Sequence, residues 1–357
     1  MTVCKIDNNQ SKPQCVSPCP VFGQCGGCSY HHIPYSEELK IKEEALEQLF
    51  FKALNLDHEI FESIIPSPKI YNYRHRLDLK FLRTKEGNFL MGFSPLGRNE
   101  IVPVSSCPIA LEAVSNFLPQ LKKEAVENCP PRYRNANLVV KTSDNGRVLW
   151  GGIGRRSLQR IEVDYLWTVV NGKKIFYSLD TFFQANLSIL PKLIDKITSL
   201  NMLDRDSVLF DCYGGVGLLG ISLADQVKKV TLIEECPASI KLANYNSQYH
   251  YLSNFQIIPA KVEERLASEI EKHQQKKKIV ILDPPRKGLS PEVINVLIEK
   301  SILISGIIYL SCHPESLVSN LKELQKNCWQ VNKIIPFDFF PRTSHVETLV
   351  VLNAKNR

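Results

Sequence analysis

The sequence has no hydrophobic run approaching the roughly 18 uncharged residues of a membrane span, and its first residues include no apolar segment that would direct secretion. We therefore expect a cytoplasmic protein. Structural disulfides are rare in the cytoplasm, so the 11 cysteines are expected to serve metal or cluster ligation, catalysis or burial. We also find no internal repeat and no low-complexity tract.

The composition that is present is that of an ordinary folded chain. Of the 357 residues, 44% are hydrophobic, which excludes wholesale disorder. The 44 Lys and Arg residues exceed the 37 Asp and Glu residues, and the net charge of +7 permits a nucleic-acid partner without demanding one. The length suggests two or three domains. Changes in pattern divide the chain into residues 1–60, 61–174 and 175–357.

The first two parts differ in their local pattern. Residues 1–35 are rich in Cys, Pro and Gly and cannot build a core alone, whereas Ser36 is a suitable N-cap for a helix that follows. From about residue 71 to 170 the pattern is strand-like, with strict alternation over 76–81. Two apolar runs flank Asp144-Asn145-Gly146, which is a hairpin signal. We therefore predict a β-rich central domain.

The last part alternates strands with helices, which implies parallel βαβ units. A loop of about ten residues joins the last two strands and is too short for a parallel crossover, so the final strand should be antiparallel to its neighbour. The sequence thus predicts an α/β fold with a doubly wound, Rossmann-like sheet that ends in a reversed strand. The predicted strands are 207–211, 229–234, 255–258, 279–283, 306–311, 329–337 and 348–352.

A glycine-rich turn follows the first of these strands. The run Cys212-Tyr213-Gly214-Gly215-Val216-Gly217 lets the backbone approach a ligand at a helix N-terminus, and Glu234 ends the next strand, where it could accept ribose hydroxyls. Two cofactor classes compete, a dinucleotide such as NAD and S-adenosylmethionine, and a tight turn without ligand is the third possibility. The closing two-strand hairpin is typical of methyltransferase sheets and favours S-adenosylmethionine.

Three further polar side chains fall at the same edge of the predicted sheet. Asp283 and Cys312 follow parallel strands, where ligands bind in open α/β sheets, and prolines fix the backbone just beyond each of them. Glu347 lies in the loop before the last strand. Cys312 could instead be a small buried hydrophobe, and Glu347 a solvated surface acid.

Several motifs occur in the order seen in RNA uracil-C5 methyltransferases, and the chain resembles the ribosomal-RNA branch of that 5-methyluridine family over nearly its whole length. These motifs are Phe183-Gln184-Ala185-Asn186, the run from Asp211 to Gly217, Asp283-Pro284-Pro285-Arg286, Ser311-Cys312-His313-Pro314 and His345-Val346-Glu347.

The resemblance implies a class I methyltransferase fold in which Cys312 is the nucleophile and Glu347 is the base. The S-adenosylmethionine contacts that it implies are Gln184, Tyr213, Glu234 and Asp283. The sequence departs from the family at His313, where Asn is usual, and at Arg342, where His or Gln is frequent.

These residue types suit the chemistry. Uracil C5 is a poor nucleophile, but addition of a thiolate at C6 generates an enolate that can attack a sulfonium methyl group. A carboxylate must then remove the C5 proton so that the thiol can leave. The reaction therefore needs one Cys, one base and one methyl donor in near-attack geometry.

The N-terminal cysteines form a ligand pattern. Cys19, Cys25 and Cys28 lie within ten residues, among glycines that allow the backbone to wrap closely, and Cys107 before Pro108 is a suitable remote fourth ligand. This set favours a [4Fe–4S] cluster over zinc, whose usual paired knuckles are missing, and over no metal. The resembling branch carries such a cluster on this spacing. We expect a structural or RNA-handling role for it, because the methyl transfer moves no net electrons.

RNA, and by resemblance ribosomal RNA, is the expected partner of a monomeric enzyme. A basic strip with interleaved Tyr133 and Trp150 is a candidate phosphate and base contact, a solvated hairpin being the alternative. Residues 73–76 are a second candidate. The basic residues of the strip are Arg132, Arg134, Lys141, Arg147, Arg155, Arg156 and Arg160.

Three other functions compete with this interpretation. They are a tRNA uridine-C5 methyltransferase, an NAD-linked iron–sulfur oxidoreductase and a catalytically silent RNA-binding protein. The oxidoreductase would need a second nucleotide-binding half, which we do not find in the sequence. The joint presence of Cys312 and Glu347 argues against a silent binder.

Overall fold

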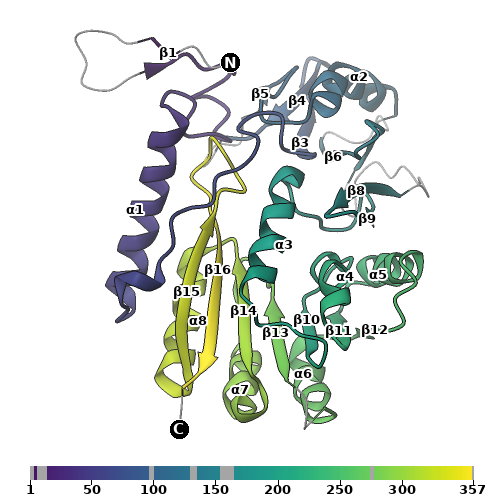
Figure 1. Cartoon of the computed structure of the whole chain (residues 1–357). Helices are drawn as coiled ribbons and strands as arrows, with labels where there is room; N and C mark the ends of the chain where they lie inside the picture. Colours follow the sequence, from purple (N-terminus) through teal and green to yellow (C-terminus); the bar gives the residue numbers. More distant parts are fainter. Residues whose placement is uncertain are drawn as a thin grey trace.

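A seven-stranded sheet forms the centre of the C-terminal part (Figure 1). The computed structural model describes residues 4–5, 14–95, 100–128, 135–152, 165–273 and 277–355. The strand order is β12-β11-β10-β13-β14-β16-β15, with β16 antiparallel to both of its neighbours, so the predicted doubly wound sheet with a reversed last strand is confirmed. Its strands are β10 (Val208–Cys212), β11 (Lys229–Glu234), β12 (Phe255–Pro259), β13 (Lys278–Leu282), β14 (Gly306–Ser311), β15 (Trp329–Phe337) and β16 (Glu347–Ala354).

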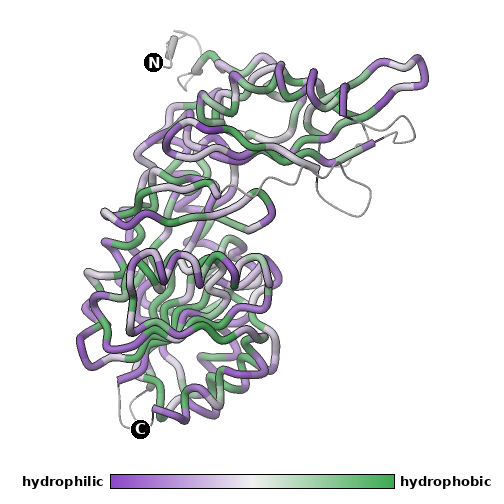
Figure 2. Tube along the Cα trace, turned by 90° about the vertical axis from the view of Figure 1, so that its right-hand side faces the viewer, coloured by the Kyte–Doolittle hydropathy of each residue, from purple (hydrophilic) through white to green (hydrophobic). Residues whose placement is uncertain are grey.

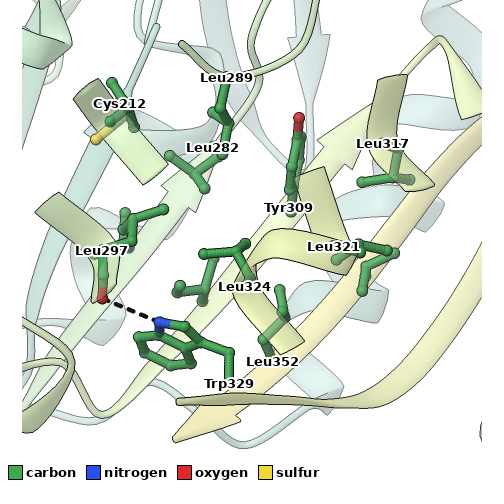
Figure 3. Packing of buried hydrophobic residues seen from close by; sticks show 14 of the residues in the cluster. Cys212, Leu282, Leu289, Leu297, Tyr309, Leu317, Leu321, Leu324, Trp329 and Leu352 are labelled. Atoms are coloured by element: carbon green, nitrogen blue, oxygen red, sulfur yellow. Dashed lines mark hydrogen bonds between the residues drawn. The ribbon is translucent and has the colours of Figure 1, made fainter. Parts of the chain in front are cut away.

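Helices bury both faces of this sheet. One apolar core lies between the sheet and α1 (Tyr35–Ala53), α6 (Val262–Glu271), α7 (Pro291–Glu299) and α8 (Pro314–Asn327). Figure 3 shows part of this core, where the Trp329 indole packs among leucines and donates a 3.0 Å hydrogen bond to the Leu297 carbonyl. The opposite core involves α3 (Leu190–Ser199), α4 (Leu218–Leu223) and α5 (Pro237–Tyr249). In Figure 2 the hydrophobic segments gather in the strands between these helices.

A five-stranded antiparallel sheet makes up the central β-rich part, in the order β5-β4-β3-β6-β7. The alternation predicted over 76–81 is observed, since Leu77, Leu79 and Phe81 are buried on one face. That face packs on α2 (Glu112–Asn128), a helix that the sequence analysis did not predict. The strands are β3 (Arg76–Arg83), β4 (Phe89–Phe93), β5 (Val102–Pro103), β6 (Asn135–Thr142) and β7 (Val148–Gly152).

Smaller elements join the parts. The β8 (Leu166–Val170) and β9 (Lys173–Tyr177) hairpin contributes side chains to the core beside α5. The remaining elements are the short pair β1 (Cys4–Lys5) and β2 (Gln14–Cys15) and the short helices η1 (His58–Ile60), η2 (Leu187–Ile189), η3 (Ala224–Gln226) and η4 (Ser301–Leu303). The domain boundaries at residues 60 and 174 stay predictions. No helix within the described ranges is long and apolar enough to cross a membrane.

Candidate active site

One pocket opens at the carboxyl ends of the parallel strands. Its volume is about 610 Å³, and its wall also includes residues of β3 from the central sheet. The parallel strands end at a common edge, and the loops that follow them carry polar side chains, as expected for an open α/β sheet. The structure brings all six predicted catalytic and donor-binding residues into this pocket, namely Gln184, Tyr213, Glu234, Asp283, Cys312 and Glu347.

Cys312 and Glu347 are neighbours because of strand register. Ser311 on β14 pairs with Thr348 on the antiparallel strand β16. Cys312, which follows Ser311, therefore lies beside Glu347, which precedes Thr348. Burial, reinforced by the Glu347 carboxylate, raises the pKa of Cys312 to about 11, while Arg286 opposes the shift. The thiol therefore keeps its proton at neutral pH.

The Glu347 carboxyl group is almost fully buried, with 3% of the residue exposed. Its Oε2 atom has no hydrogen-bond partner among the described residues. Burial raises the pKa of Glu347 well above its usual value, Asp283 adds to the shift and Arg286 opposes it. A buried, unpartnered carboxyl group of this kind is typical of functional sites.

Asp283 adds a carboxyl group to this pocket, and Asp211 lines an adjoining hollow that shares Asp283 with it. Burial raises the pKa of Asp283 to about 7, with a further contribution from Asp211, and Gln184 Nε2 donates a 3.1 Å hydrogen bond to Asp283 Oδ2. Burial likewise raises the pKa of Asp211 to about 7. A pocket with so many carboxyl groups suits a positively charged ligand.

The glycine-rich turn is built around two carboxylates. Glu234 accepts hydrogen bonds from the Gly215 amide at 2.9 Å and the Cys236 amide at 2.8 Å, which ties the end of β11 to the turn. Asp211 accepts one from the Gly220 amide at 2.8 Å. A Cβ atom at Gly220 would lie only 2.7 Å from Asp211 Oδ2, so the close approach of α4 to β10 requires glycine there.

A second cavity, of about 190 Å³, is lined by the four predicted cluster ligands, Cys19, Cys25, Cys28 and Cys107. Burial raises the pKa of Cys28 to about 12, and the nearby Cys107 and Cys19 thiols add to the shift. A Cβ atom at Gly27 would lie 3.4 Å from Cys25 Sγ, so this glycine leaves room beside the thiol. Within the part of the chain that the structure describes, no group of three or more His, Cys, Asp or Glu side chains is arranged to hold a single metal ion.

The predicted RNA strip needs correction. Lys141 is fully buried and donates to the Ser178 and Thr181 carbonyls, and Trp150 is 3% exposed, so the prediction of an RNA-facing role for these two residues is wrong. Period-two alternation does not show which face of a strand is covered, and here α2 and the segment after β9 cover them. Arg132, Tyr133, Arg134, Arg155, Arg156 and Arg160 lie outside the described residues.

The second candidate for RNA contact, residues 73–76, has two buried and two pocket-lining side chains. Tyr73 and His75 are buried, so they cannot contact RNA, whereas Arg74 and Arg76 line the active pocket. Arg286 and the 65% exposed Phe182 also line the pocket, and the sequence analysis gave neither a role. Arg286 lies within one of the motifs that carry the resemblance, and Phe182 directly precedes another. This position in the sequence could have indicated that both residues lie at the site.

Comparisons with known proteins identify the family. A model of the family described as tRNA (uracil-5-)-methyltransferase matches residues 148–355. An uncharacterized RNA methyltransferase of Clostridium tetani is 31% identical, with 95% of this chain and 84% of that protein covered. One from Thermotoga maritima is 27% identical, with coverage of 99% and 87%. The chain belongs to the tRNA (uracil-5-)-methyltransferase family, so it is an S-adenosylmethionine-dependent RNA uracil-C5 methyltransferase and not an NAD-linked oxidoreductase or a silent RNA-binding protein.

A solved structure supports the fold. The tRNA (uracil-54, C5)-methyltransferase of Pyrococcus abyssi, determined with S-adenosyl-L-homocysteine, superposes with a TM-score of 0.69 at 22% identity. The superposition covers 96% of this chain and 88% of that one. The similarity therefore extends beyond the methyltransferase sheet to the central and N-terminal parts.

Proposed function

We propose that this enzyme methylates uridine C5 through a covalent bond between Cys312 and uracil C6, and that Glu347 then removes the C5 proton. The observation that carries the proposal is the register of β14 and β16, which sets these two side chains next to each other in the 610 Å³ pocket. A uridine stacked in RNA cannot reach a recessed thiol, so the base must be flipped into the pocket.

The proposed reaction uses the Cys312 thiol, the Glu347 carboxylate and the methyl donor. Cys312 loses its proton to solvent, and the thiolate adds to C6. The resulting enolate attacks the sulfonium methyl group through C5, and the donor leaves as a neutral thioether. The Glu347 carboxylate takes the C5 proton, the C6–S bond breaks, and the thiolate is released.

The charge state of the pocket links catalysis to donor binding. Burial disfavours the charged forms of both Cys312 and Glu347 and so raises both pKa values. A sulfonium cation in the same pocket lowers both pKa values by direct attraction. The two groups therefore become reactive when the methyl donor is present, which limits reaction of the thiol at other times.

The donor contacts follow from the pocket lining. Glu234, at the end of β11, is placed to accept ribose hydroxyls, and Tyr213 lies in the turn after β10. Asp283 and Gln184, which are hydrogen-bonded to each other, offer polar atoms to the amino-acid part of the donor. The negative lining complements the positive charge of S-adenosylmethionine.

We infer that Cys19, Cys25, Cys28 and Cys107 hold a [4Fe–4S] cluster. Zinc–sulfur bonds of about 2.3 Å would set four thiolates about 3.8 Å apart, whereas a cubane holds them further apart. The four thiols line one cavity of about 190 Å³. A cluster bound there would cross-link the N-terminal segment to the loop that carries Cys107.

We propose ribosomal RNA as the substrate and a monomer as the active form. The cysteine spacing supports the ribosomal branch, and one chain supplies all six of the proposed catalytic and donor-binding residues. Transfer RNA is the second candidate, because the description of the matching family names it.

The test is methylation of separated ribosomal and transfer RNA, from a strain lacking the enzyme, with a labelled methyl donor. We expect 5-methyluridine in ribosomal RNA, no detectable product with Cys312→Ala, and unchanged donor binding by that variant. Cys328→Ala is the matched control, because Cys328 is partly buried but does not line the pocket. Product in transfer RNA alone would reject the ribosomal assignment, and activity of Cys312→Ala would reject the covalent mechanism.

A further inference from the structure

The loop of residues 338–346, between β15 and β16, carries the chain into Glu347. Four successive backbone carbonyl groups in this loop each accept a hydrogen bond from a different part of the protein. The donors are Asn186 Nδ2 to Phe339 at 3.1 Å, Lys42 Nζ to Phe340 at 3.1 Å, Tyr73 Oη to Pro341 at 3.0 Å, and the Ser29 and Tyr30 amides to Arg342 at 2.7 and 3.1 Å.

Four charged side chains are buried where this loop meets α1, and we call them the buried ion cluster: Glu38 and Lys42 from α1, and Asp338 and Arg342 from the loop. Lys42 Nζ lies 2.8 Å from both Glu38 Oε1 and Asp338 Oδ1. Arg342 Nη1 lies 3.4 Å from Glu38 Oε2, and the Arg342 amide donates to Glu38 Oε1 at 2.7 Å. The side chains are at most 3% exposed, and the two positive charges balance the two negative ones.

The buried ion cluster also contacts the segment that carries the cysteines. Arg342 Nη1 donates to the Tyr30 carbonyl at 3.1 Å and the Ile33 carbonyl at 2.9 Å. The Ser29 amide, which donates to Arg342, directly follows Cys28. Arg342 itself has a φ of 70°, a conformation that costs free energy for a residue with a side chain and must be held by its surroundings.

The Glu347 carboxyl group, in contrast, has a buried Oε2 atom without a hydrogen-bond partner among the described residues. Pairing of β16 with β14 and β15 places Glu347 beside Cys312, and the backbone of the loop of residues 338–346 sets where that strand begins. In Figure 1 this loop lies at the end of β15 and β16 nearest the N-terminal segment. The carbonyl contacts and the buried ion cluster are what hold that backbone.

We propose that the buried ion cluster positions Glu347 for removal of the C5 proton, by tying the loop of residues 338–346 to α1 and to the cysteine-bearing segment. Lys42 and Arg342 are positioning residues in this account and touch no substrate. The inference rests on the proposed function, because it assigns Glu347 as the base. It also gives the cysteine cavity a place in the enzyme, since the segment that lines it holds the catalytic loop.

The test separates the base step from the steps before it. RNA containing 5-fluorouridine has no C5 proton to lose, so thiolate addition and methyl transfer leave a stable adduct whether or not Glu347 is well placed. For Lys42→Met we expect this adduct to form at the wild-type rate. Turnover of uridine RNA should fall roughly tenfold to a hundredfold, the range that a small misplacement causes, with methylated RNA accumulating on the protein.

Lys333→Met is the matched control, because Lys333 pairs with Glu62 at 3.0 Å on the surface and is 49% exposed. Lys42→Met leaves one buried negative charge uncompensated, so a double variant with Glu38→Gln restores neutrality while Gln can still accept from the Arg342 amide. We expect the double variant to fold and to keep the same defect. Hydrogen exchange at Ser29 and Tyr30 should be faster in both variants than in the control.

Two results would overturn the proposal. If fluorouridine adduct formation falls together with turnover in the double variant, the buried ion cluster supports the whole pocket and not Glu347. If turnover matches the Lys333→Met control, the loop does not depend on the ions. A wild-type enzyme that forms no fluorouridine adduct would instead reject the proposed function, and the inference with it.

Discussion

At the scale of single residues, Cys312 and Glu347 share one environment that suppresses charge on both. Burial raises the pKa of each group, Glu347 adds to the shift at Cys312, and Asp283 adds to the shifts at both. Arg286 opposes both shifts and is the nearby cation that the motif Asp283-Pro284-Pro285-Arg286 supplies. Burying ionisable groups in this way lowers the free energy of unfolding, and such a loss of stability is common at functional sites.

This cost should depend on pH. The folded-state pKa of Glu347 is raised above 4.5, so the folded protein holds this proton where the unfolded chain releases it. The contribution of this group to the free energy of unfolding is therefore greatest below pH 4.5 and decreases as the pH rises toward the folded pKa. Glu347→Gln should raise the stability at pH 8 by about 0.5–2 kcal/mol and have little effect near pH 4.5. Thermal unfolding at several pH values measures this, and an equal effect at all of them would contradict the pKa direction.

At the scale of elements, the strand ends were predictable and the surfaces of the central sheet were not. Helical segments separate the apolar runs of the large sheet, so the pattern predicted parallel strands whose carboxyl ends share one edge. The polar residues that end or follow these runs were therefore expected at that edge; they are Asp211, Glu234, Asp283 and Cys312. Lys141 was misjudged because a strand pattern does not reveal which element covers each face. The buried ion cluster brings together residues almost 300 positions apart and left no local signal.

Glu234 links the end of β11 to the glycine-rich turn by hydrogen bonds, so replacing it should weaken binding of the methyl donor. Glu234→Ala removes two hydrogen bonds to the backbone, at Gly215 and Cys236, and the acceptor that we propose for the donor ribose. Binding of S-adenosylmethionine should weaken by about 1.5–3 kcal/mol, the value of charge-assisted hydrogen bonds. Calorimetric titration measures it. Asp225→Ala, which removes an exposed acid paired with Lys173, is the control, and equal affinities for the two variants would contradict the assignment.

At the scale of the whole molecule, the three parts of the chain meet around the loop of residues 338–346. Helix α1 contributes Leu46 and Phe50 to the core of the large sheet, while Arg74 lines both the cysteine cavity and the active pocket. The sequence predicted a link between the cysteine segment and the central part through Cys107, but no link to the active pocket. The packing instead joins the two cavities through a shared wall.

The cysteine cavity carries its own prediction. Protein purified without oxygen should be brown and contain about four iron atoms per chain, as expected for a Cys₄ cubane. Cys25→Ser and Cys28→Ser should bleach it, whereas Cys236→Ser, at an exposed cysteine outside the cavity, should not. Metal analysis and the visible absorption spectrum decide this. A colourless protein with one zinc per chain would show that the cavity holds an ion instead.

The most direct test of covalent C5 methylation uses RNA with tritium at uridine C5 and a ¹⁴C-labelled methyl donor. The wild-type enzyme should release one tritium for each methyl group transferred, because the C5 proton must leave. Glu347→Gln should transfer at most one methyl group per chain, release no tritium and retain the RNA on Cys312 through denaturing electrophoresis. Repeated methyl transfer by the wild-type enzyme without tritium release would place the methyl group elsewhere and contradict the mechanism.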